Sequence, residues 1–285
     1  MNPILLCFAD GTSFFVGLAM TLVADLLILR FRVGRVRSIL NVLAVTGIIF
    51  VVISATPLPL WAYALWLIAA TAALVAGNMA TSTRNVRFVL AGLAAAATVA
   101  FALAELPHRQ MPHIDVSPRT TIYVLGDSIS AGMGTGHKCW PAVLADTTGL
   151  SVVSLAQPGA TVRGALKQSY GVVEPGAVVI VEIGGIDVLE GTDPAIFAEQ
   201  LEMLVSSLRA RNHRVLLIEL PLYPFKNAFG MAQRRIAAKY NVAVLPKRCF
   251  TKVLGTKNGT LDGLHLSQEG HDAMAGIIAE VLRKE

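Results

Sequence analysis

Two short blocks of the sequence hold residue types that could together perform nucleophilic catalysis. The first reads GDSISAG from Gly126 to Gly132 and follows an apolar, β-branched stretch. A serine on a tight turn between a strand and a helix exposes its hydroxyl at the edge of a sheet, with backbone N–H groups free to face an anion. Because Gly-Asp-Ser also makes ordinary turns, Ser128 is a candidate nucleophile only if a base accompanies it.

The second block, Asp262-Gly263-Leu264-His265, could supply that base. An imidazole removes a hydroxyl proton best when a carboxylate fixes its tautomer and stabilises the imidazolium. The three-residue spacing lets Asp262 and His265 turn toward the same point. In isolation the tetrad is better explained as a turn aspartate with a chance histidine neighbour, so the two blocks count only together.

The segments around these blocks alternate between two patterns. Five apolar runs rich in β-branched residues are typical of buried parallel strands, at 121–125, 151–155, 178–183, 215–219 and 242–245. Helical segments are expected at 141–148, 162–168, 194–211, 229–240 and 267–283, with Asp193 and Ser267 as helix caps. The alternation predicts a three-layer, doubly wound α/β fold with a five-stranded parallel sheet of the flavodoxin-like kind. Ligands are expected at the carboxyl ends of its strands.

From 121 to 285 the chain resembles the SGNH or GDSL hydrolases, especially the small bacterial periplasmic lysophospholipase/thioesterase type. The serine block, the segment WPAVL from Trp140, the approach to Gly159, the segment VEIGG from Val181 and the Asp-x-x-His block occur in the family's order. The resemblance implies that Ser128 is the nucleophile, His265 the base and Asp262 the acid that orients it.

The resemblance also implies an oxyanion hole made by the backbone N–H groups of Ser128 and Gly159. The family's third donor is the asparagine side chain of a Gly-x-Asn-Asp block, and Ile186 stands at that position here. Isoleucine cannot donate, and losing one such donor typically costs about 10² to 10³ in rate. The residues that flank these positions, expected to support the site, are Asp127, Gly184, Gly185 and Asp187.

The N-terminal part of the chain has a different composition. Residues 1–107 hold six of the 24 Lys and Arg and three of the 19 Asp and Glu. Four apolar stretches, at 14–29, 39–53, 60–76 and 88–104, are each near the ~20 residues that cross a bilayer. Buried helices of a soluble core are the alternative, but so small a region could not surround four of them with polar surface. We expect a transmembrane region over 1–106, a linker over 107–119 and the hydrolase domain over 120–285.

The arginines predict how the spans are oriented. They fall between spans one and two and between spans three and four, as Arg30, Arg32, Arg35, Arg37, Arg84 and Arg87. By the positive-inside bias both loops are cytoplasmic, so the C-terminal domain is extracytoplasmic, or periplasmic in a Gram-negative source. Trp61, Tyr63 and Trp66 flank the intervening outer hairpin as expected interfacial aromatics.

Several classes of site are not indicated. There is no Lys/Arg stripe interleaved with aromatics, which argues against nucleic acid as a partner. No set of His, Cys or carboxylates has metal-ligand spacing, and no cofactor is expected. His137, in the loop after the serine, is a candidate substrate contact. Cys139 and Cys249 are both extracytoplasmic in this topology, which leaves a disulfide between them open.

Together these features predict a membrane-anchored esterase that works through an acyl-enzyme. The resemblance implies lysophospholipids or other acyl esters as substrates. O-acetyl groups on envelope glycans are the alternative within the class. A binding or sensing module that has lost turnover through Ile186, and a transport device with the domain as an accessory, are the rivals from other classes. The sequence does not specify the oligomeric state.

Overall fold

The computed structural model describes residues 3–31, 33–133 and 136–284, which divide into two compact units. Residues 7–109, together with 223–227, form a helical unit. The remaining described residues form a unit built around a parallel sheet. Arg32, one of the expected loop arginines, lies outside the described residues.

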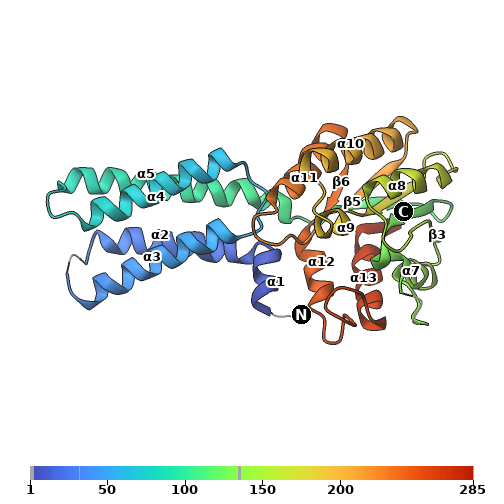
Figure 1. Ribbon diagram of the computed structural model, residues 1–285, viewed down its shortest axis with the longest axis horizontal. Helices are drawn as coiled ribbons and strands as arrows, with labels where there is room; N and C mark the ends of the chain where they lie inside the picture. Colours follow the sequence, from blue (N-terminus) through green and yellow to red (C-terminus); the bar gives the residue numbers. More distant parts are fainter. Residues whose placement is uncertain (1–2, 32, 134–135, 285) are drawn as a thin grey trace. The chain divides into compact units, whose positions relative to one another are not determined.

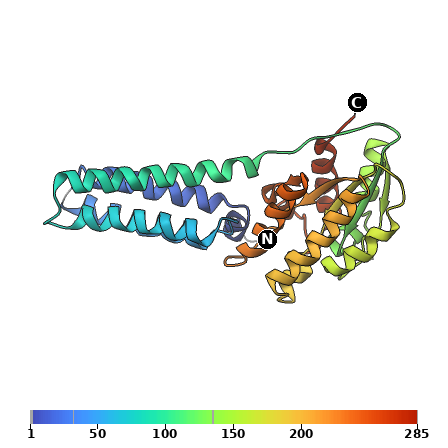
Figure 2. The same ribbon diagram turned by 90° about the horizontal axis from the view of Figure 1, so that it is seen from above.

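The helical unit consists mainly of four apolar helices that run side by side (Figures 1 and 2). They are α2 (Thr12–Ile28), α3 (Arg35–Ile53), α4 (Leu60–Asn78) and α5 (Arg84–Glu105), preceded by the short α1 (Pro3–Ala9). Helices α3, α4 and α5 are long and apolar enough to cross a membrane. Helix α2 has 17 residues, which is the lower end of the length that spans a bilayer.

Helices α2 and α3 approach each other through two glycines. A Cβ atom at Gly17 would lie 2.6 Å from the carbonyl oxygen of Gly47, and one at Gly47 would lie 2.8 Å from that of Gly17. Only the absence of both side chains allows this separation, as is common where apolar helices pack in a membrane.

The helical unit has an apolar exterior, unlike a soluble bundle, around an interior that holds both apolar and polar side chains. Large apolar side chains point outward, among them Ile39, Val42, Leu60, Leu65, Ile68, Val89, Leu93 and Leu103. Polar side chains are also buried, including Thr21, Asp25, Arg37, Thr98 and Glu105. An apolar exterior with polar groups inside is what a lipid environment favours.

Arg37 and Trp66 illustrate how these buried polar groups are satisfied. The Arg37 guanidinium donates to the carbonyl oxygens of Ile28 at 2.8 Å and Phe31 at 3.2 Å, and so caps the end of α2. The Trp66 indole donates to Thr98 Oγ1 at 3.0 Å and its ring stacks on Phe101. Trp66 is therefore a core residue, and its expected interfacial position is wrong because its N–H finds a partner inside the bundle.

The second unit contains a five-stranded, wholly parallel sheet. In sheet order its strands are β3 (Ser151–Ser154), β2 (Thr121–Gly126), β4 (Val178–Glu182), β5 (Arg214–Ile218) and β6 (Ala243–Leu245). The helices are α6 (Ser128–Ala131), α7 (Trp140–Thr148), α8 (Val162–Gln168), α9 (Gly185–Leu189), α10 (Pro194–Ala210), α11 (Asn227–Tyr240), α12 (Lys247–Leu254) and α13 (Gln268–Val281). This is the predicted three-layer α/β fold with a five-stranded parallel sheet.

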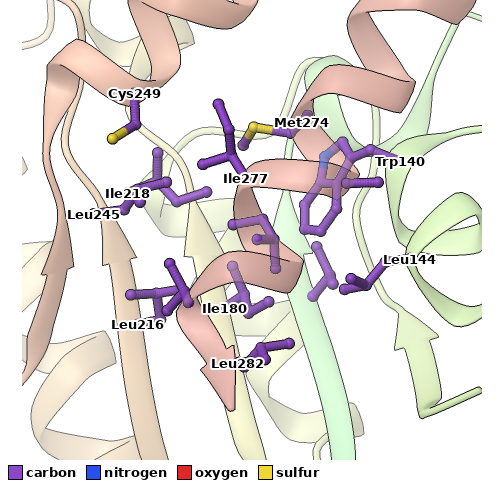
Figure 3. Packing of buried hydrophobic residues seen from close by; sticks show 14 of the residues in the cluster. Trp140, Leu144, Ile180, Leu216, Ile218, Leu245, Cys249, Met274, Ile277 and Leu282 are labelled. Atoms are coloured by element: carbon purple, nitrogen blue, oxygen red, sulfur yellow. The ribbon is translucent and has the colours of Figure 1, made fainter. Parts of the chain in front are cut away.

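Side chains alternate between the two faces of the sheet, so each face carries its own apolar layer. On one face Ile122, Ile180 and Leu216 pack against α7, α12 and α13. Figure 3 shows the layer on this face, to which the strands contribute Ile180, Leu216 and Ile218 and helix α7 contributes Trp140 and Leu144. Helix α10 lies on the opposite side of the sheet from α13 (Figures 1 and 2).

Each of the five strands lies within two residues of its predicted position, and the helices differ in detail. Three short helices, α6, α9 and α12, were not expected from the sequence. The last helix ends at Val281, two residues early, because the chain continues as β7 (Leu282–Lys284). Strand β7 pairs in parallel with β1 (Ile114–Val116). The segment 107–119, expected to be a linker, therefore contains β1 and also the end of the 3₁₀ helix η1 (Leu106–Arg109).

Candidate active site

Ser128 is the first residue of α6 and follows directly on β2 through Asp127. The Asp127 side chain accepts a hydrogen bond from the Ile129 N–H at 2.9 Å and so caps this one-turn helix. Gly126 is required at the end of the strand, because a Cβ atom there would lie 2.6 Å from Ser130 Oγ. The turn holds Ser128 at the carboxyl end of a central strand, as predicted.

Asp262 and His265 are brought together within one loop. Asp262 Oδ2 lies 2.7 Å from His265 Nδ1, and Oδ1 accepts from the backbone N–H groups of Leu264 at 2.9 Å and His265 at 2.8 Å. The hydrogen bond from His265, followed by these backbone bonds, holds the pKa of the Asp262 carboxyl below its usual range. A carboxylate at Nδ1 requires the proton on that nitrogen, which leaves Nε2 free to accept one.

The loop that carries this pair is closed by backbone hydrogen bonds. The Leu261 N–H donates to the His265 carbonyl at 2.8 Å, and the Ser267 N–H donates to the Gly259 carbonyl at 3.1 Å. Asp262 is 55% exposed and His265 is 21% exposed, so solvent reaches the pair. Backbone geometry, rather than burial, therefore holds the two side chains in place.

His265 lies close enough to the serine turn for its charge to lower the pKa of Asp127. Among the residues that the structure describes, no hydrogen bond joins the Ser128 hydroxyl to His265. Catalytic hydrogen bonds are often long without substrate and shorten in the complex. The serine turn and the loop of His265 are thus neighbours. The hydrogen bond between the Ser128 hydroxyl and His265 is expected to form when the substrate is bound.

The other two positions of the expected oxyanion hole, Gly159 and Ile186, lie in the segments that follow β3 and β4. Gly159 lies in the exposed loop after β3 with φ +75°, a left-handed conformation that favours glycine. Ile186 is the second residue of α9 and is half-buried. Asp187 Oδ2 accepts from the Val162 N–H at 3.0 Å and so ties α9 to the segment that follows Gly159.

Glycines and Asp187 support this arrangement. Gly184 adopts φ +111°, and a Cβ atom there would lie 2.8 Å from the Phe197 ring and 2.9 Å from Leu220. A Cβ atom at Gly185 would lie 3.5 Å from Asp127 Oδ2, so α9 passes close to the serine turn. Asp187 is buried, and its Oδ1 is one of the few buried side-chain oxygens of the described residues without a hydrogen-bond partner.

Three buried carboxyl groups, those of Asp127, Glu182 and Asp187, lie near the serine turn. Burial raises the pKa of Asp127 to about 6, against the lowering effects of the Ile129 N–H and of His265. Burial also raises the pKa of Asp187, and raises that of Glu182 well above its ordinary value, with a further contribution from the Asp127 charge. Glu182 was not singled out from the sequence. An acid in the otherwise apolar run VVIVEI was the available signal.

The remaining candidates lie elsewhere or form no site. His137 Nδ1 is buried without a partner, and the residue lies close to Glu269 and His271 of α13. None of the three cysteines is in a disulfide. Cys139 Sγ contacts the Ala131 carbonyl and Cys249 Sγ contacts Met111 Sδ, so no disulfide joins them. Over the described residues there is no group of three His, Cys, Asp or Glu that could hold a metal ion.

With the fold and site in view, comparison with known proteins defines the class. Residues 124–273 match the GDSL-like lipase/acylhydrolase family, which is more than half of the chain. The chain belongs to this family, and it is a carboxylic ester hydrolase of the SGNH/GDSL esterase and lysophospholipase type.

Individual relatives support the assignment. The chain is 31% identical over 160 residues to the esterase TesA of Pseudomonas aeruginosa, covering 51% of this chain and 79% of the relative. It is 27% identical over 173 residues to thioesterase 1/protease 1/lysophospholipase L1 of Escherichia coli, covering 57% and 83%.

Solved structures agree on the fold. A crystal structure of TesA has 28% identity and a TM-score of 0.50, with coverage of 57% of this chain and 97% of that chain. The esterase EstA from Pseudoalteromonas has 22% identity and a TM-score of 0.52, with coverage of 57% and 96%. The similarity to EstA is one of fold alone.

The raised pKa of Asp127 predicts a pH-dependent effect of Asp127→Asn on stability. The folded-state pKa of about 6 exceeds the ~3.9 of an unfolded chain. Between pH 4 and 6, Asp127 is therefore ionised in the unfolded parent and still largely protonated in the folded parent. The free energy of unfolding of the parent falls as the pH rises through this range. Asparagine keeps the helix cap without a titratable group. The free energy of unfolding of Asp127→Asn, relative to that of the parent, should therefore be about 1 to 3 kcal/mol higher at pH 7.5 than at pH 4.

Denaturant unfolding of the full chain in detergent, at both pH values, measures this difference. Glu182 is common to both proteins, so most of its own titration cancels. A stability difference that stays constant across this range would mean that Asp127 does not titrate there.

Proposed function

We propose that the chain is a membrane-anchored serine ester hydrolase in which Ser128 is the nucleophile, His265 the general base and Asp262 the acid that orients it. The observation that supports this most is the 2.7 Å contact between Asp262 and His265 Nδ1, in a loop close to the serine turn. That contact leaves His265 Nε2 as the acceptor for the Ser128 proton.

The chemistry then follows in two steps. Ser128 Oγ attacks the ester carbonyl carbon while its proton passes to His265 Nε2, and the alcohol leaves with that proton. Water then gives a proton to His265 and attacks the acyl-enzyme, which releases the acid and restores Ser128. Asp262 stabilises the imidazolium in both steps without itself becoming protonated.

The proposed oxyanion hole uses the backbone N–H groups of Ser128 and Gly159. Ile186 occupies the place of a side-chain donor and offers none. Two backbone donors allow turnover at a reduced rate. This feature also supports a second candidate, a binding or sensing module that keeps the fold and has lost useful turnover.

For the substrate we propose a small-molecule or lipid ester of the acyl type, such as a lysophospholipid. The support is the similarity to a relative that is named a thioesterase and lysophospholipase. Aryl esters of graded chain length measure the preferred acyl length, and acetylated glycans test the alternative of an O-acetyl esterase.

We propose that residues 1–106 anchor the enzyme by four membrane crossings, that 107–119 connect them to the hydrolase domain, and that the domain at 120–285 lies outside the cytoplasm. The outward apolar surface of α3, α4 and α5 supports insertion in a membrane. The arginines near the starts of α3 and α5 support the orientation, since such residues prefer the cytoplasmic side.

Replacement of the proposed triad residues tests the mechanism. Ser128→Ala should lower kcat by about 10⁶ and abolish labelling by a fluorophosphonate, and His265→Ala should lower kcat as much. Asp262→Asn should cost about 10⁴, because His265 remains present. Ser151→Ala, at an exposed serine of the edge strand, is the control that should leave kcat unchanged. Normal turnover by a folded Ser128→Ala protein would eliminate this mechanism.

The oxyanion hole is tested by Ile186→Asn with Ile186→Val as its matched control. The amide would be aimed at charge that develops only in the transition state, so kcat should rise by up to ~10² while KM changes little. Valine offers no donor and should leave kcat near that of the parent. A folded Ile186→Asn protein that is slower on every ester would show that isoleucine suits this pocket as built.

A reporter that is active only in the cytoplasm tests the topology. Fused after Glu285 it should be inactive, whereas fused between Met79 and Thr83, in the connection between α4 and α5, it should be active. Activity of the first fusion would overturn the proposed orientation of the hydrolase domain.

A further inference from the structure

Hydrogen bonds link four buried residues near the candidate active site, one of them donated by a backbone N–H and two by side chains. The Trp140 backbone N–H donates to His271 Nδ1 at 3.2 Å, and the Trp140 indole N–H donates to Ser130 Oγ at 3.1 Å. Ser130 Oγ donates in turn to Glu182 Oε2 at 2.8 Å. Each of the four residues is at most 2% exposed. We call Glu182, Ser130, Trp140 and His271 the buried bridge.

Chemistry fixes the direction of the two bonds that Trp140 donates. An indole N–H can only donate, so Ser130 Oγ must accept from Trp140. Its single hydrogen is then available for Glu182, which also accepts from the Asp127 N–H. His271 accepts at Nδ1, so its ring carries no proton there. Because all four residues are buried, removing one partner leaves a polar group unsatisfied, which is costly.

One end of the buried bridge is fixed to the serine turn. Ser130 lies two residues after Ser128 in the one-turn helix α6. The end of β2 just before this turn is held as well, because the Gln168 side chain donates to the Gly126 carbonyl and accepts from its N–H, both at 3.0 Å. The missing side chain of Gly126 leaves the room that Ser130 occupies.

The other end is fixed to the loop of the base. His271 lies on α13, whose first turn is capped by Ser267 through the Gly270 N–H at 3.2 Å. Ser267 lies two residues after His265, and its own N–H closes the loop onto Gly259 at 3.1 Å. A displacement of α13 is therefore transmitted to His265 and Asp262.

We propose that the buried bridge positions the nucleophile relative to the base, with Ser130 and His271 as positioning residues that do not touch the substrate. The proposal rests on the proposed roles of Ser128 and His265. Those two residues sit on separate segments, and the described structure places no direct hydrogen bond between them. A displacement of about 1 Å between reacting groups can cost about 10² in rate. The bridge sets this separation from inside the core.

Ser130→Ala tests the proposal by removing the middle of the bridge. In the full chain, kcat on an aryl ester and the rate of fluorophosphonate labelling should both fall by about tenfold or more, with KM within about twofold, because geometry and not binding is lost. Ile278→Val is the control, since it trims a fully buried side chain of α13 in the same apolar core and removes no hydrogen bond of the bridge. It should leave kcat unchanged even where it lowers Tm.

A second pair of variants tests the other end independently. His271→Asn keeps an acceptor near the place of Nδ1, whereas His271→Leu removes it. The asparagine variant should retain several times more kcat than the leucine variant at equal substrate saturation. This comparison carries the test if Ser130→Ala does not fold.

The outcomes separate this proposal from the proposed function. Full turnover in Ser128→Ala would remove the catalytic triad and the bridge with it. If Ser128→Ala is inactive but Ser130→Ala keeps the kcat of the Ile278→Val control, or His271→Asn and His271→Leu are equally active, the triad stands and the positioning role is overturned.

Discussion

Parallel pairing of β2 with β4 places Gly126 opposite Glu182, and the two strands end side by side. Everything that follows them must turn at the same edge of the sheet. The serine turn grows from β2 and the segment with Ile186 and Asp187 grows from β4. Because this register is fixed by apolar side chains on both faces of the two strands, the position of Ser128 is set by the core rather than by the loops.

The same constraint brings carboxyl groups together at a cost. Asp127 and Glu182 are forced next to each other by the strand register, and Asp187 follows five residues after the end of β4. Each is buried, and burial raises the pKa of each. Backbone N–H groups offset part of the cost, since Ile129 donates to Asp127 and Val162 to Asp187. A cluster that opposes stability in this way is typical of a site kept for function.

The two units of the chain both bury apolar side chains, but they differ in what they expose and in which polar groups they bury. In the sheet unit the apolar side chains lie inside, between strands and helices. In the helical unit Ile39, Val42 and Leu60 point outward, while Arg37 and Trp66 find their hydrogen-bond partners inside. Both patterns follow from satisfying polar groups where no water is available. The sheet unit thus has the burial pattern of a protein folded in water, and the exterior of the helical unit is suited to a membrane.

The sequence by itself determined the class of fold, because hydrophobic patterning is local. Runs such as 178–183 read as buried strands from their β-branched residues, and Asp193 and Ser267 mark helix starts that the structure keeps. It also identified Ser128, Asp262 and His265 as candidates, since Gly-Asp-Ser and Asp-x-x-His carry their chemistry in short, local spacing.

Tertiary structure alone decided which distant residues meet. Strand order made neighbours of Asp127 and Glu182, and the packing of α7 on α13 gave Trp140 its contact with His271, 131 residues away in the chain. The last helix ended early because Leu282 pairs with Ile114, a partner that local propensity cannot report. Tertiary packing also separates Cys139 from Cys249, because each thiol contacts a different part of the fold. Patterning says which face of an element is buried, but only packing says against what.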